Sequence, residues 1–131
     1  MTLKIASYMI PVFIIVSLFL NRSCAPLVVG AAAGAGVVAY NMGELKTTDE
    51  VSLDRAWIAS QAAVDAMGFH VTNREHDAVD GVLEATGAND KDISIRLHSI
   101  SPNLTEIRIR VDVFGNEDLS RRILSEIRRR Y

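Results

Sequence analysis

The stretch ISIRLHSISPNLTEIRIRVDV, residues 93–113, decides the fold. Apolar and polar residues alternate in its first part, and the same alternation resumes from Glu106 to Val113. A period of two is typical of strands that bury one face of a sheet and leave the other in water. Ser101-Pro102-Asn103 predicts a tight turn between the two strands, which requires antiparallel pairing. The inward side chains of the second strand are expected to be Ile107, Ile109, Val111 and Val113.

The flanking segments predict more strands and two helices. Further strands are expected at residues 44–50, 69–75 and 81–86. Ser52 is placed to cap a helix that Gly68 ends, and Asn116 is placed to cap a second one. The first helix has an apolar stripe of Leu53, Ala56, Trp57, Ser60, Val64 and Met67. The second has a stripe of Leu119, Ile123, Leu124, Ile127 and Tyr131, with Arg128–Arg130 placed to complement the dipole at its end.

The order of these elements, β-α-β-β-β-β-α, predicts an α+β fold in two layers. We expect an antiparallel sheet of about five strands, with both helices on its one buried face. The chain is expected to divide into a signal peptide or anchor (1–23), a lipidated cysteine with a glycine- and alanine-rich tether (24–42), and the α+β domain (43–131).

The N-terminal residues predict export. Lys4 precedes an apolar run from Ile5 to Leu20, which as a helix would be about 24 Å long and shorter than the ~30 Å hydrocarbon core. Such a run followed by polar residues is the plan of a secretory signal. Ser23-Cys24 resembles the end of a bacterial lipoprotein signal, so Cys24 is the expected site of lipidation. Asn21-Arg22 departs from that pattern, so an uncleaved helical anchor is the alternative.

The segment from Ala25 to Tyr40 is rich in alanine, glycine and valine. Gly30 and Gly34 form a G-x-x-x-G spacing, which lets helices approach closely inside a membrane. A flexible tether and self-association through this glycine stripe are the two interpretations.

Composition argues against several functions. The formal net charge is −2, and removal of a leader would take away Lys4 and Arg22 but no acidic residue. A mildly acidic chain is not expected to bind nucleic acid. The single cysteine excludes an internal disulfide. The domain is small for a large enclosed pocket, and no G-x-S-x-G, C-x-x-C or H-x-x-x-H spacing occurs, so we expect no enzyme, cofactor or metal site.

The polar face of the predicted sheet is the most promising surface for a ligand. The side chains expected on it are His70, Thr72, Arg74, Arg96, His98, Arg108 and Arg110, with Glu84, Glu106 and Asp112 interspersed. Possible ligand-binding residues are Arg96, Arg108, Arg110 and His98, because neighbouring arginines can bind a phosphate, a carboxylate or an acidic partner. The alternative is cross-strand pairing of opposite charges on a solvated face. A metal shared by His70 and His98 is disfavoured.

Several short motifs follow one another along the chain. They are Cys24-Ala25, the glycine-alanine stretch to Tyr40, Gly43-Glu44-Leu45, Leu53-Asp54-Arg55-Ala56-Trp57, Phe114-Gly115-Asn116-Glu117, and Ser120-Arg121-Arg122-Ile123-Leu124 leading into Ile127. In this order the chain resembles a family of small bacterial lipoproteins known only as a domain of unknown function. The resemblance implies an anchored envelope domain and no known activity.

The expected function is therefore that of a non-enzymatic lipoprotein of the bacterial cell envelope. The expected location is periplasm-facing, at the outer membrane, because Ala25 rather than aspartate follows the cysteine. The expected partners are the membrane, through the lipid anchor, and another envelope protein or a second copy of the chain. An anion-binding or small-ligand module on the arginine-rich face is the alternative.

Overall fold

The hairpin expected over residues 93–113 lies at the centre of the sheet. The computed structural model describes residues 36–131, and in it β5 (Asp92–Ser101) pairs antiparallel with β6 (Leu104–Val111). Ile95 lies opposite Ile109 and Leu97 opposite Ile107, with all four side chains buried. The alternation in the sequence therefore predicts this hairpin and its buried face correctly.

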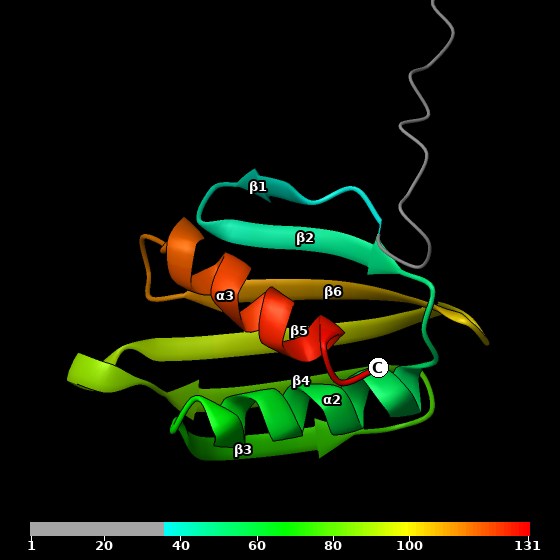
Figure 1. Cartoon of the computed structure of the whole chain (residues 1–131), viewed down its shortest axis with the longest axis horizontal. Coiled ribbons are helices and arrows are strands. Elements are labelled where there is room, and N and C mark those ends of the chain that lie inside the picture. The colour runs from blue at the N-terminus through cyan, green and yellow to red at the C-terminus, as the bar shows by residue number, and fades with distance from the viewer. Residues whose placement is uncertain (1–35) are drawn as a thin grey trace, which may run out of the picture. The chain divides into compact units, whose positions relative to one another are not determined.

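The other strands extend the sheet on both sides of the hairpin. They are β1 (Ala39–Asn41), β2 (Glu44–Asp49), β3 (His70–His76) and β4 (Asp80–Thr86), and a short 3-10 turn, η1 (Ala88–Asp90), connects β4 to β5. The strand order is β1-β2-β6-β5-β4-β3, and every neighbouring pair is antiparallel. Figure 1 shows both helices lying across one face of this sheet.

Both helices begin at the predicted caps, and the first also ends as predicted. The second ends at Arg128, so Arg129, Arg130 and Tyr131 lie beyond the helix that was expected to include them. In α2 (Leu53–Ala66) the Ser52 side chain accepts a hydrogen bond from the Arg55 amide, and in α3 (Glu117–Arg128) Asn116 accepts one from the Leu119 amide. Gly68 follows α2 with a φ of +75°, a conformation that favours glycine. The predicted two-layer α+β architecture is confirmed in these elements.

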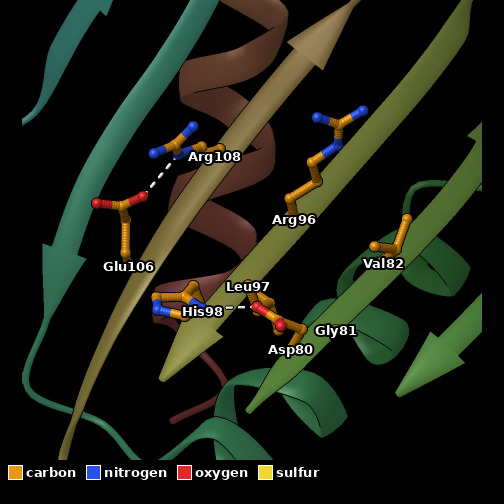
Figure 2. A pocket seen from close by; sticks show the side chains of 8 residues that line it. All are labelled: Asp80, Gly81, Val82, Arg96, Leu97, His98, Glu106 and Arg108. Carbon is orange, nitrogen blue, oxygen red and sulfur yellow. Dashed lines mark hydrogen bonds and ion pairs between the residues drawn. The ribbon is translucent and has the colours of Figure 1, made fainter. Parts of the chain in front are cut away.

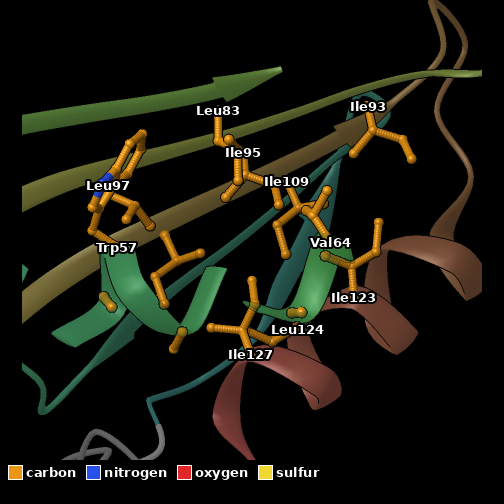
Figure 3. Packing of buried hydrophobic residues seen from close by; sticks show 14 of the residues in the cluster. Trp57, Val64, Leu83, Ile93, Ile95, Leu97, Ile109, Ile123, Leu124 and Ile127 are labelled. Atoms are coloured by element: carbon orange, nitrogen blue, oxygen red, sulfur yellow. The ribbon is translucent and has the colours of Figure 1, made fainter. Parts of the chain in front are cut away.

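The hydrophobic core lies between the sheet and the helices. Val64 of α2 lies near Ile123, Leu124 and Ile127 of α3, whereas Trp57 lies beside Leu97 (Figure 3). The inward residues of the strands complete the core, and they include Leu45, Leu83, Ile93, Ile95, Leu97, Ile107, Ile109 and Val111. Since the apolar residues of every element collect here, the opposite face of the sheet is left to polar side chains.

The sheet has six strands, where about five were expected. The additional strand, β1, lies within residues 24–42, which we expected to be a tether, and pairs with β2 from Ala39↔Lys46 to Asn41↔Glu44. A two-residue turn joins them, with positive φ at Met42 (50°) and Gly43 (80°), as in a type I′ hairpin. The half-buried Tyr40 packs on the core. Packing, rather than any strand-like pattern, brings this short segment into the sheet.

The second strand of the central hairpin is shorter than expected. It ends at Val111, and Val113 is 80% exposed instead of buried. Asp112 adopts a φ of 56°, and its carboxylate accepts a hydrogen bond from the Asp92 amide. This turn interrupts the alternation, so the prediction for Val113 is wrong.

A β-bulge at Thr72 changes which residues of β3 lie on the polar face of the sheet. Val71 lies opposite Ala85 but Asn73 lies opposite Glu84, so β3 carries one extra residue at this point. The alternation shifts by one residue beyond the bulge. Arg74 consequently lies opposite the buried Leu83, on the side of the helices, and not on the open face where it was expected.

Candidate functional site

The open face of the sheet carries a cationic row across three neighbouring strands. The register places Lys46 of β2 opposite Arg108 of β6, and Arg108 opposite Arg96 of β5. Like charges in directly opposed positions repel one another unless counter-ions intervene. The placement of carboxylates around this row therefore decides which of its cations are available to a ligand.

Glu106 neutralises one end of the cationic row. Its carboxylate accepts a hydrogen bond from Arg108 Nε at 2.6 Å and lies 3.1 Å from Lys46 Nζ. Burial acts to raise the pKa of Glu106, but the bonds from Arg108 and Lys46 outweigh it and hold that pKa below its usual value. The bond to Glu106 raises the pKa of Arg108 in turn. Glu44 adds a longer contact of 4.0 Å to Arg108 Nη1.

Arg96 is the cation of this row that stays available. Its side chain is exposed, and within residues 36–131 it takes part in no ion pair. Its cross-strand neighbours are Arg108 on β6 and the apolar Val82 on β4. In Figure 2 the Arg96 side chain stands apart from the two hydrogen-bonded pairs around it.

The surroundings of Arg96 form an open concavity of about 520 Å³. Its lining includes Asp80, Val82, Arg96, His98, Glu106 and Arg108. At one edge His98 Nδ1 lies 2.6 Å from Asp80 Oδ1, with both side chains more than half exposed. Among residues 36–131, the concavity therefore offers one guanidinium outside any ion pair, beside Arg108 and His98, which already have carboxylate partners.

The predicted ligand-binding residues are divided by the structure. Arg96, His98 and Arg108 line the same concavity, whereas Arg110 borders a second one of about 530 Å³ with Glu84 and Ser94. The alternative of cross-strand charge pairing describes His98, whose partner Asp80 lies on β4. The close partner of Arg108 is Glu106 on the same strand, and its cross-strand contact to Glu44 is the longer one. The alternative does not describe Arg96.

The register of the sheet keeps His70 apart from His98. His70 lies opposite Thr86 at one end of β4, while His98 lies opposite Asp80 at the other end. His76, which follows the strand expected at residues 69–75, is the last residue of β3, and its ring stacks on Trp57 with a centroid separation of 4.9 Å.

Sequence reasoning missed a buried ionic network around Asp49, a fully buried residue at the end of β2. Arg128 Nε donates to Asp49 Oδ2 at 2.8 Å and Nη2 donates to Oδ1 at 2.7 Å. The hydroxyl groups of Tyr131 and Thr47 also donate to this carboxylate, at 2.7 and 3.0 Å. The amide of Gly36 adds a longer contact of 3.4 Å. The network joins α3, β2 and the segment before β1.

The hydrogen bonds of this network control its charge states. Burial acts to raise the pKa of Asp49, but the bonds from Arg128, Tyr131 and Thr47 outweigh it, so the pKa lies below its usual value. Burial and the bond to Asp49 raise the pKa of the Tyr131 phenol well above its usual value. The signal in the sequence was an aspartate on the inward side of β2, in phase with Leu45 and Thr47.

Comparison with known protein families gives one match that covers most of the chain. Residues 7–130 match the family described as "Protein of unknown function (DUF3568)". The chain belongs to this family. The matched range includes Cys24 and the six-stranded domain, and it confirms the resemblance to a domain of unknown function. No curated protein matches the chain.

Two further observations concern the described part of this DUF3568 chain. Within residues 36–131, no three His, Cys, Asp or Glu side chains come together in a way that would hold a metal ion. None of the helices in that range is both long enough and apolar enough to span a membrane. Cys24, the apolar run and the Gly30/Gly34 stripe lie outside the described residues.

Proposed function

We propose that this chain is a non-enzymatic lipoprotein of the bacterial cell envelope, held at the outer membrane by lipid on Cys24 and facing the periplasm. The domain would act by binding another envelope component or a second copy of itself. The observation that carries the binding role is the open face of the sheet, which neither helix covers. The N-terminal sequence supports the anchor, because Lys4, the apolar run and Ser23-Cys24 follow the order of a lipoprotein signal.

Replacing Cys24 with serine tests the anchor. We expect Cys24→Ser to move the protein from the membrane fraction to the soluble fraction if the leader is still removed, or to leave an unprocessed precursor without lipid. The measurement is the intact mass of protein purified from membranes, with wild type expected to show residues 24–131 plus diacylglycerol. A full-length wild-type mass without lipid would contradict the proposal and favour an uncleaved helix over Ile5–Leu20.

A second candidate function, binding of an anionic group at the cationic row, is favoured by Arg96. Its guanidinium is exposed and carries planar donors that match phosphate or carboxylate oxygens. Arg108 lies directly opposite and can turn a donor toward the same group while keeping its bond to Glu106. The apolar Val82 on the other side adds no competing carboxylate.

The Arg96→Ala variant tests this second function. We expect inorganic phosphate and citrate to raise the melting temperature of the full chain, and Arg96→Ala to weaken the binding about tenfold through loss of a charged hydrogen bond. Arg96→Ala combined with Arg108→Ala should abolish it. The matched control is Arg55→Ala, an exposed arginine on α2. Equal thermal shifts in wild type and the Arg96→Ala variant would contradict an anion site here.

A further inference from the structure

Three large apolar side chains lie exposed at one end of the domain. Met42 is 87% exposed, Val113 80% and Phe114 94%. Met42 lies in the β1–β2 turn, and the other two lie in the connection from β6 to α3. Figure 1 shows this turn and this connection at the same end of the sheet. We call these three residues the apolar tip.

The apolar tip is held in place by contact between the backbones of its two segments. A Cβ built on Gly115 would lie 2.3 Å from the Cα of Gly43 and 2.4 Å from the hydroxyl oxygen of Tyr40. A Cβ on Gly43 would lie 3.0 Å from the carbonyl oxygen of Phe114. Arg110 also donates to the Met42 carbonyl at 3.2 Å. The tip is therefore preorganised, which lowers the entropic cost of binding through it.

The charges beside the tip indicate the kind of surface that it fits. Asp112 precedes Val113, and Glu117 and Asp118 follow Phe114 in the first turn of α3. Glu117 is paired with Arg121 at 2.8 Å, but within residues 36–131 Asp118 has no ion-pair partner. An acidic rim is repelled by anionic lipid, so a basic surface with an apolar floor is a better match than a membrane.

The chain itself carries such a surface between β1 and α3. A concavity of about 340 Å³ is lined by Val38, Leu124 and Ser125 together with Arg121, Arg128 and Arg129. We call it the basic socket. All three arginines have a carboxylate partner: Arg121 is paired with Glu117, Arg128 with Asp49 and Arg129 with Glu126. Arg129 is the most exposed of them, with 70% of its side chain accessible. The socket thus combines an apolar floor with a basic rim.

We propose that the apolar tip of one copy docks into the basic socket of a second copy. Phe114 enters over Val38 and Leu124, and Asp118 approaches Arg129. The proposed dimer has a two-fold axis, so that each copy places its tip in the socket of the other and the assembly closes at two copies. The proposal rests on the proposed binding role and names self-association as its form, through a surface separate from the cationic row.

Sedimentation velocity of the full chain in detergent micelles, over a concentration series, measures the dimer. Phe114→Ala should weaken dimerisation about thirtyfold, the loss expected when an aromatic anchor at the centre of an interface is truncated. The matched control is Ile58→Ala, because Ile58 is 65% exposed on α2 and belongs to neither surface. Equal dimerisation of wild type and Phe114→Ala would overturn the proposal and assign the association to another surface, such as the glycine stripe.

Charge reversal separates a specific contact from a folding defect. Asp118→Arg alone and Arg129→Glu alone should both be monomeric, because each places like charges in the contact. A mixture of the two variants should dimerise again, since each tip then meets a socket of opposite charge. Absence of this rescue, or a wild type that stays monomeric, overturns the proposal. The apolar tip would then be a contact surface for lipid or for a different protein. Arg96→Ala should leave dimerisation unchanged, so a failure of the proposed anion site can be distinguished from a failure of the proposed dimer.

Discussion

The Asp49→Ala variant is expected to lose about 3 kcal/mol of unfolding free energy, the magnitude typical when one partner of a buried ion pair is removed. Asp49 is fully buried and accepts hydrogen bonds from Arg128, Tyr131 and Thr47. Alanine leaves the half-buried Arg128 guanidinium without its counter-ion and two hydroxyl groups without their acceptor. A deficit of this kind costs more than the pair contributes when intact, because the remaining charge stays desolvated.

Urea denaturation followed by the fluorescence of Trp57 measures this loss. Glu50→Ala is the matched control, since Glu50 is the next residue, is exposed and should change stability by less than about 0.5 kcal/mol. The pH dependence has a definite sign. The folded pKa of Asp49 is lowered from 3.8, so its contribution is complete above that value and is lost as the pH falls through the folded pKa. Asp49→Asn should remove this part of the acid sensitivity; an unchanged acid profile would contradict the role of the network.

Gly115→Ala is expected to cost about 3 kcal/mol and to separate the two segments of the apolar tip. Gly115 has a φ of +81°, which by itself costs an alanine roughly 1–2 kcal/mol. The added Cβ would also lie 2.3 Å from the Cα of Gly43, so one of the two backbones must move. Overpacking of this kind costs a further ~2 kcal/mol, so backbone strain and overpacking together account for the expected loss.

Gly68→Ala is the matched control for Gly115→Ala. Gly68 has a comparable φ of +75°, but its Cβ would meet no atom within 4 Å. We expect Gly68→Ala to lose only about 1 kcal/mol, by backbone strain alone. Urea denaturation compares the two variants, and sedimentation velocity asks whether Gly115→Ala also weakens the dimer. Equal losses of unfolding free energy in the two variants would show that the close approach to Gly43 does not contribute to the cost of Gly115→Ala.

Part of the candidate site was predictable from the sequence, and part of it was not. Arg96, Arg108 and His98 alternate with buried residues in the central hairpin, so their common face follows from a period of two. The same alternation misplaced Arg74, because the extra residue at Thr72 shifts the alternation of β3. The availability of Arg96 was equally hidden, since only the register between strands places Lys46 near Glu106 and sets Arg96 between Arg108 and Val82.

The amino-acid sequence by itself determined the α+β class, the central hairpin, both helices and their caps. These features arise from local periodicity and from side chains that bond to their own backbone a few residues away. Tertiary structure alone decided that β1 joins the sheet, that Arg128 reaches Asp49 across 79 residues, and that Gly43 meets Gly115. These contacts depend on how separate elements pack together. A local pattern carries no record of that packing, because the partners come together only when the core forms.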